Sequence, residues 1–170
     1  MRRNNSSKAR LLSRYRAGLA AAMFLCVVLA VPSETRPAGR SIGLSPVQDL
    51  SFGTLGVGNI AGTATVDTAG GKTVSAGVID LGGIATAAVF DVTGEKNMAF
   101  SIVILTPSVT LQAGAIPGPL LSNFQVSPSP FGVLNNTGKA TISIGASLSL
   151  SPSLAEASYG GTFDIMISYQ

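Results

Sequence analysis

Large apolar side chains recur at every second position over residues 162–169, and Thr162, Asp164, Met166 and Ser168 lie between them. One side of an extended backbone there would carry only large apolar groups, namely Phe163, Ile165, Ile167 and Tyr169. This period of two is typical of a β-strand with one buried face. Full burial of four such side chains would contribute about 6–12 kcal/mol, which is comparable to the stability of a whole domain, about 5–15 kcal/mol. We therefore expect this strand to be packed into the fold.

The same β texture extends back to residue 42. Segments rich in Val, Ile, Thr and Ser are separated by Gly or Pro clusters about every 8–12 residues, a spacing typical of short strands. The alternation predicts strands at residues 44–55, 62–67, 72–78, 85–93, 98–105, 109–112, 120–126, 139–150 and 162–169. About eight or nine short strands predict an all-β, antiparallel β-sandwich.

Four local features refine this prediction. Residues 98–105 are almost continuously apolar, which favours a central strand covered on both faces. Prolines at 107, 117, 119, 128 and 130 should confine residues 109–112 and 120–126 to edges or loops. Gly145 interrupts the alternation of residues 139–150 and suggests a bend or bulge. Residues 151–157 are the best candidate for a helix, of one or two turns, with Pro152 at its first position.

The first 30 residues have the pattern of a secretory signal peptide. Six of the eleven basic residues lie in the first sixteen positions, and a 15-residue apolar run follows, broken only by Gly18. That run is shorter than the approximately 20 residues that a membrane-spanning helix needs. Cleavage after Ala30 and cleavage after Ser33 both fit, and an uncleaved signal anchor is the alternative. We expect export to the periplasm, cell surface or medium, with membrane contact only during export.

Removal of residues 1–30 reverses the charge balance. Five basic residues then face eight acidic ones, a formal charge of −3. Residues 31–41 read as a flexible leader, and residues 42–170 as one domain. The remaining chain has no basic patch for a phosphate backbone, so nucleic-acid binding is not expected. It also contains no cysteine, so the sheet core must provide stability without a disulfide.

The chain lacks the residues of most catalytic and metal sites. It has no histidine, and its one cysteine, Cys26, lies in the predicted signal. Nucleophilic triads and zinc, iron or copper sites therefore lose their usual members. We expect no enzymatic activity and no cofactor. A carboxylate pair for glycoside hydrolysis remains the least favoured alternative, with Asp80 and Asp91 as its candidates.

Four motifs in order carry a resemblance to a known family. They are LSFG at residues 50–53, GTATVD at 62–67, AVFDVTG at 88–94 and GTFDIMISY at 161–169. This set resembles an uncharacterised bacterial family, domain of unknown function 4402, from about residue 44 to residue 170. The resemblance implies an exported immunoglobulin-like sandwich, similar to fimbrial subunits and spore-coat-U-type proteins. It further implies assembly by a periplasmic chaperone and an outer-membrane usher.

Such subunits lack one strand of the sandwich, and a partner supplies it by β-augmentation. The resemblance assigns the partner-binding handle to the apolar row Phe163, Ile165, Ile167 and Tyr169. An N-terminal segment with alternating apolar residues would be the donor to a neighbouring subunit. Ile42 and Leu44 are the candidates, although Pro46 interrupts the alternation. The alternative is that this segment is the first strand of its own domain.

The function favoured by these observations is that of a structural subunit of a bacterial surface fibre or coat, pilin-like and assembled by β-strand complementation. Its expected partners are a chaperone, an usher and neighbouring subunits. The alternative is a self-contained secreted or cell-surface binding or adhesion module, with ligand contacts in loops around residues 117–130. The third is the secreted carboxylate hydrolase.

Overall fold

A computed structural model describes residues 39–170 of the protein. The predicted signal peptide, both cleavage positions and most of the leader lie outside these residues. The regular structure of the described part consists of twelve β-strands without a helix, and every strand pair is antiparallel. The predicted all-β antiparallel fold is confirmed, with more strands than expected. The strands are β1 (Gly43–Gln48), β2 (Ser51–Val57), β3 (Gly62–Val66), β4 (Lys72–Val74), β5 (Val78–Thr86), β6 (Ala88–Thr93), β7 (Ala99–Ile104), β8 (Ser108–Ala113), β9 (Ile116–Ser127), β10 (Phe131–Val133), β11 (Lys139–Leu150) and β12 (Ile165–Tyr169).

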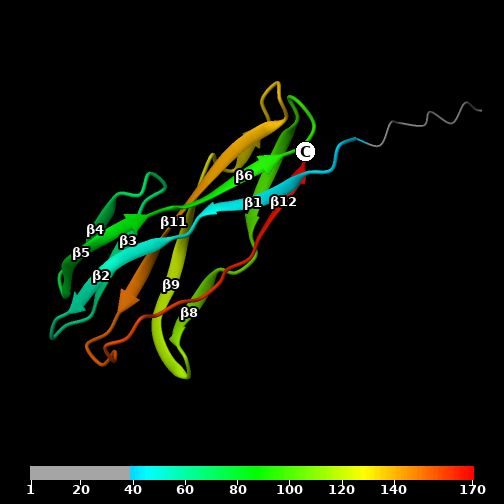
Figure 1. Ribbon diagram of the computed structural model, residues 1–170. Helices are drawn as coiled ribbons and strands as arrows, with labels where there is room; N and C mark the ends of the chain where they lie inside the picture. The colour runs from blue at the N-terminus through cyan, green and yellow to red at the C-terminus, as the bar shows by residue number, and fades with distance from the viewer. Residues whose placement is uncertain (1–38) are drawn as a thin grey trace, which may run out of the picture. The chain divides into compact units, whose positions relative to one another are not determined.

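Strand β11 is the centre of the largest sheet (Figure 1). Its first half pairs with β6 and its second half with β3, while β9 pairs along its other edge. Strands β1, β4 and β8 complete this seven-stranded sheet. The predicted bounds of residues 139–150 are confirmed. The predicted bulge is also present, because the register with β9 shifts between Gly145 and Ser147.

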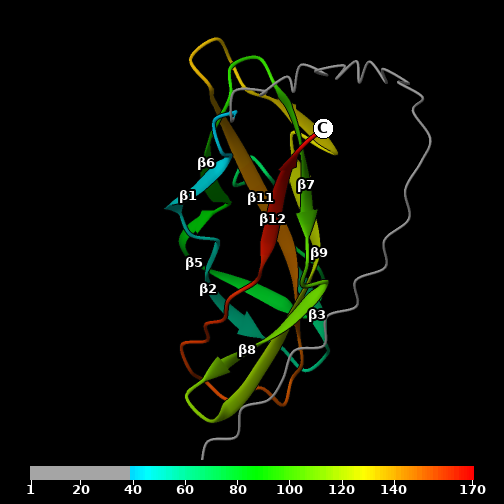
Figure 2. The same ribbon diagram turned by 90° about the vertical axis from the view of Figure 1, so that its right-hand side faces the viewer.

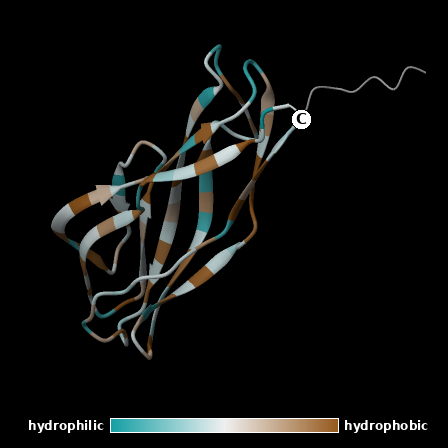
Figure 3. Ribbon diagram, turned by 45° about the vertical axis from the view of Figure 1, so that its right-hand side comes forward, coloured by the Kyte–Doolittle hydropathy of each residue, from teal (hydrophilic) through white to brown (hydrophobic). Residues whose placement is uncertain are grey.

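Two smaller sheets complete the sandwich. One has the order β10-β7-β12, and Figure 2 shows β12 in front of β11. Its inner face encloses a fully buried cluster with β6 and β11, formed by Val92, Phe100, Leu134 and Ile142. The other sheet is the pair β2-β5. Its side chains pack on a second cluster, which contains Ala64, Val78, Leu121, Ala146, Leu148 and Leu150. Figure 3 shows hydrophobic and hydrophilic residues following one another as bands along the strands.

The first predicted strand, residues 44–55, is wrong as a single element. The chain changes sheets at residues 49–50, so that β1 pairs with β6 and β2 pairs with β5. Strand β5 itself was not predicted. It begins at the last residue of the predicted segment 72–78 and ends at the second residue of the predicted segment 85–93. Its middle contains Gly82 and Gly83, which both have positive φ and lie where the register with β2 is irregular. When only the sequence is known, a glycine pair suggests a turn. In the structure, this pair forms a bulge inside a strand.

Three further predictions are corrected. Strand β7 is central in its sheet, but its outer face is uncovered, and Val103 is 43% exposed. Strand β9 is not an edge strand, because it lies between β8 and β11. Its prolines at 117 and 119 precede the stretch paired with β11, which starts at Leu120, so they interrupt no bond to β11. Residues 151–157 form turns rather than a helix.

Candidate functional site at the C-terminal strand

Strand β12 is an edge strand that pairs with β7 alone among residues 39–170. The predicted alternation of its side chains is confirmed. Ile165, Ile167 and Tyr169 point inward and pack, half-buried, against the cluster around Phe100. Met166 points outward and is 47% exposed. The strand thus contributes one row of apolar side chains to the core and leaves its own outer face uncovered.

The backbone of β12 has an open edge. The amide of Leu105 donates to the carbonyl oxygen of Asp164 at 2.9 Å, and the amide of Gln170 donates to that of Ala99 at 3.1 Å. In an antiparallel ladder, only every second residue exchanges hydrogen bonds with a given neighbour. Residues 164, 166, 168 and 170 therefore face β7. The N–H and C=O groups of residues 165, 167 and 169 face the opposite edge, where no strand of the described chain pairs.

Tyr169 is held at the end of this strand by two hydrogen bonds. Its hydroxyl donates to the carbonyl oxygen of Arg40 and accepts from the amide of Glu95, each at 2.7 Å. Gly94 leaves the space that this hydroxyl needs, because a Cβ at residue 94 would collide with it and with Leu134. The sequence pattern indicates the role of Tyr169 but not that of Gly94. The only sign of Gly94 in the sequence is a glycine directly after the alternating residues of β6.

Phe163 was predicted to lie in the same strand, and this is wrong. The strand begins at Ile165, and Phe163 belongs to the irregular segment 151–164 that leads to it. Its ring packs on that of Phe124 in β9, with ring centroids 4.9 Å apart. In the same segment, Gly160 exchanges two backbone hydrogen bonds with Gln112 of β8. Segment 151–164 therefore contacts β8 and β9 of the large sheet, and the chain pairs with β7 as a regular strand only from Ile165 onward.

The candidate donor residues Ile42 and Leu44 lie in the chain's own domain. Leu44 pairs with Val92 of β6, and both candidates pack on the same cluster as Ile165 and Ile167. Of the two alternatives, the structure shows the one in which this segment is the first strand of its own domain. Strand β1 is thereby an edge strand of the large sheet, as β12 is of the facing sheet.

The outer face of the β10-β7-β12 sheet is uncharged and largely apolar. Phe131 and Val133 of β10 lie on the same face as Val103 and Met166, which are paired, and all four are exposed. On the same face, the hydroxyls of Ser101 and Ser168 form a hydrogen bond with each other at 3.0 Å. No charged side chain lies at an outward position of these three strands. This face could not be recognised from the sequence, because the apolar run of β7 predicts a strand covered on both sides.

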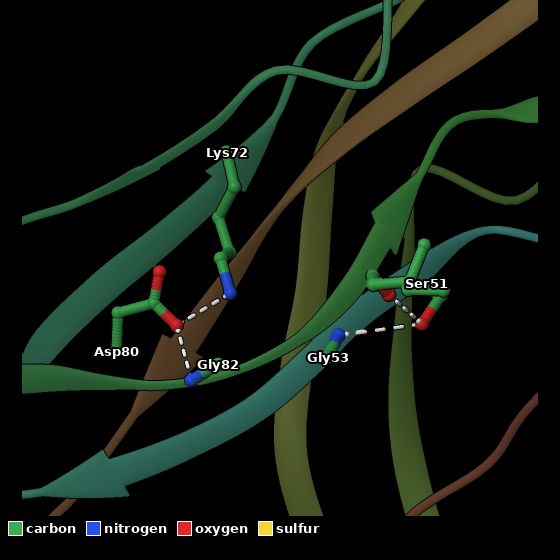
Figure 4. Close-up of polar contacts among 6 residues, drawn as sticks. Ser51, Gly53, Lys72, Asp80 and Gly82 are labelled. Carbon is green, nitrogen blue, oxygen red and sulfur yellow. Dashed lines mark hydrogen bonds and ion pairs between the residues drawn. The ribbon is translucent and has the colours of Figure 1, made fainter.

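The two carboxylates considered for hydrolysis lie in different sheets. Asp80 in β5 accepts hydrogen bonds from the Lys72 ammonium at 2.5 Å and from the amide of Gly82 at 2.9 Å (Figure 4). The Lys72 hydrogen bond, followed by that from Gly82, lowers the pKa of Asp80 below its ordinary value of 3.8. Asp91 in β6 accepts from the Thr141 hydroxyl at 3.1 Å. The structure gives each carboxylate a structural partner and does not bring the two together.

Other kinds of functional site have little support in the part of the chain that the structure describes. No three His, Cys, Asp or Glu side chains there come together as a metal site. No helix there is long and apolar enough to cross a membrane. The region around residues 117–130, expected to supply ligand-binding loops, is mostly strand β9. The open edge of β12 and the apolar face beside it therefore remain the strongest candidate site.

A protein-family model described as Domain of unknown function (DUF4402) matches residues 42–169. The chain belongs to this family. The match covers β1 to β12, so all strands of the sandwich are part of the DUF4402 domain. No curated protein and no solved structure matches the chain significantly. The predicted family resemblance is confirmed, whereas the likeness to fimbrial subunits stays a prediction.

Proposed function

We propose that this DUF4402 protein is an exported structural subunit of a bacterial surface fibre or coat, and that it assembles by β-strand complementation at β12. The observation that carries the proposal is the open edge of β12, where the backbone groups of Ile165, Ile167 and Tyr169 face no strand within residues 39–170. The signal-peptide pattern of residues 1–30 supports export. The periplasm, cell surface and medium are the compartments in which assembly would take place.

Natural proteins usually protect an edge strand against pairing with other chains. Lysine, proline, a bulge or a very short strand serves this purpose. Strand β12 has none of these features, since its five residues carry no charge and keep an unbroken register with β7. An incoming strand would gain backbone hydrogen bonds to residues 165, 167 and 169. Its apolar side chains would extend the half-buried row of Ile165 and Ile167.

The same edge would serve two partners in succession. A periplasmic chaperone would occupy it first and keep the apolar row out of water. A neighbouring subunit, delivered through an outer-membrane usher, would then replace the chaperone. Because Ile42 and Leu44 pack in their own domain, the replacing strand must come from another segment than the one first considered.

A proline at residue 167 tests the proposal. The amide of Ile167 faces the open edge, so Ile167→Pro removes a donor from that edge without removing a bond to β7. Ile167→Ala is the matched control, because it also loses the isoleucine side chain but keeps the amide. The readout is sedimentation velocity of the exported protein purified from periplasm, over a range of concentrations.

We expect the wild-type protein and Ile167→Ala to self-associate, and Ile167→Pro to sediment as a monomer. Circular dichroism and a cooperative unfolding transition must show that the proline variant is folded. A cooperative wild-type monomer at every concentration would contradict the proposed function. Assembly of a folded Ile167→Pro variant like that of the wild type would contradict the assignment to β12.

A further inference from the structure

We propose that the strand accepted by β12 is β12 of a second copy, paired antiparallel about a two-fold axis through Ile167. This inference rests on the proposed function, because it requires strand addition at this edge. It names the partner that the proposed function leaves open.

Strand β12 differs from the other edge strands within residues 39–170. Strands β4 and β10 have three residues each. Strand β1 contains Pro46, and its register with β6 shifts between Pro46 and Gln48. The registers of β8 with β9 and of β2 with β5 are also irregular. Strand β12 alone combines more than three residues with an unbroken register. The edge that fits β12 best is therefore another β12.

The open backbone groups of β12 are disposed symmetrically. They belong to residues 165, 167 and 169, so an antiparallel copy centred on Ile167 places 165 opposite 169 and 167 opposite itself. Each of these three pairs is of the type that exchanges two backbone hydrogen bonds. All N–H and C=O groups of the open edge would thus find partners. A two-fold contact of this kind is self-complementary and closes at two copies. The proposed fibre or coat would therefore be built from such dimers through a second contact surface.

The side chains that would meet are compatible on both faces. On the inner face, Ile165 of one copy would lie beside Tyr169 of the other, and the two Ile167 side chains would face each other. On the outer face, Met166 would lie opposite Ser168 of the second copy. The five residues of the strand carry no charge, so no like charges would oppose each other across the new pair. The apolar outer faces of the two β10-β7-β12 sheets would become continuous.

Disulfide trapping tests this register directly. Residues 31–170 contain no cysteine, so Met166→Cys and Ser168→Cys each provide one thiol per mature chain. Residues 166 and 168 of the two copies would form a pair without mutual backbone hydrogen bonds, with Cα atoms about 4.5 Å apart. This separation lies within the range that a disulfide spans, about 4.4–6.8 Å. Both residues point outward from the sheet.

The experiment mixes the two exported variants in equal amounts, allows exchange, oxidises them and separates the products by non-reducing electrophoresis. We expect a disulfide-linked dimer in the mixture and no comparable dimer from either variant alone. Peptide mapping should show the 166–168 link. Val133→Cys, an outward residue on β10 at the opposite edge, is the control and should not link to either variant.

The other outcomes overturn the inference. A strong link from Met166→Cys alone or from Ser168→Cys alone would show a pairing centred elsewhere. Absence of the mixed link, while the wild type self-associates and Ile167→Pro does not, would show that another segment supplies the strand. The proposed function would survive that result. A wild-type monomer at all concentrations would instead overturn the proposed function, and this inference with it.

Discussion

The hydroxyl of Tyr169 donates a hydrogen bond to the carbonyl oxygen of Arg40, 129 positions earlier in the chain, at 2.7 Å. The hydroxyl oxygen of Tyr169 also accepts a hydrogen bond from the amide of Glu95. One side chain at the end of β12 therefore joins the residues before β1 to the connection between β6 and β7. The last strand is fixed at this end through its side chain, while its backbone edge stays open.

Tyr169→Phe should weaken the protein by removing both hydrogen bonds while keeping the ring in the core. Each bond contributes about 0.5–1.5 kcal/mol, so we expect a loss of about 1–3 kcal/mol in the free energy of unfolding. Urea titration measures it. Tyr159→Phe is the matched control, because its hydroxyl makes one bond, to Ala155 four residues away. An equal loss from both variants would show that the two hydrogen bonds of Tyr169 stabilise the fold no more than the single bond of Tyr159.

Gly94→Ala should also destabilise the fold, because the added Cβ would collide with the Tyr169 hydroxyl. Overpacking of this kind costs about 1–3 kcal/mol. Removal of the hydroxyl relieves part of the collision, so Gly94→Ala combined with Tyr169→Phe should cost less than the sum of the two changes. Gly160→Ala is the control, since its added Cβ meets nothing within 4 Å. Additive losses in the double variant would contradict the contact.

The ion pair between Lys72 and Asp80 predicts a pH dependence of stability. The pKa of Asp80 is lowered in the folded protein, chiefly by the Lys72 hydrogen bond. The stabilisation is therefore present above the ordinary value of 3.8 and is lost as the pH falls through the lowered pKa. Asp80→Asn should reduce the free energy of unfolding at pH 7 and have a smaller effect near pH 3. A difference that grows toward low pH would contradict this sign.

Much of the fold could be predicted from alternation alone. The bounds of β11 and the inward row of β12 follow from apolar residues at every second position, because these strands keep one face toward the core throughout. The break between β1 and β2 could not be predicted, since the chain stays extended while it changes sheets. Strand β5 was hidden by Gly82 and Gly83, whose positive φ serves a bulge instead of a turn.

The candidate site could be predicted only in part. The sequence indicates which side chains of β12 share a face, but the direction of its backbone groups depends on the register with β7. The exposed outer face of β7 was also beyond the sequence, because a second apolar face looks the same whether or not another layer covers it. Gly94 is meaningful only once Tyr169 is known to reach it.

Amide hydrogen exchange at β12 tests the central claim most directly. In a dilute, unassembled sample, the amides of residues 166, 168 and 170 should exchange slowly, because they face β7, and those of 165, 167 and 169 should exchange faster. In an assembled sample all six should be protected. Uniform protection of the six amides in the unassembled protein, with no change on assembly, would show that the edge is closed and would contradict the account.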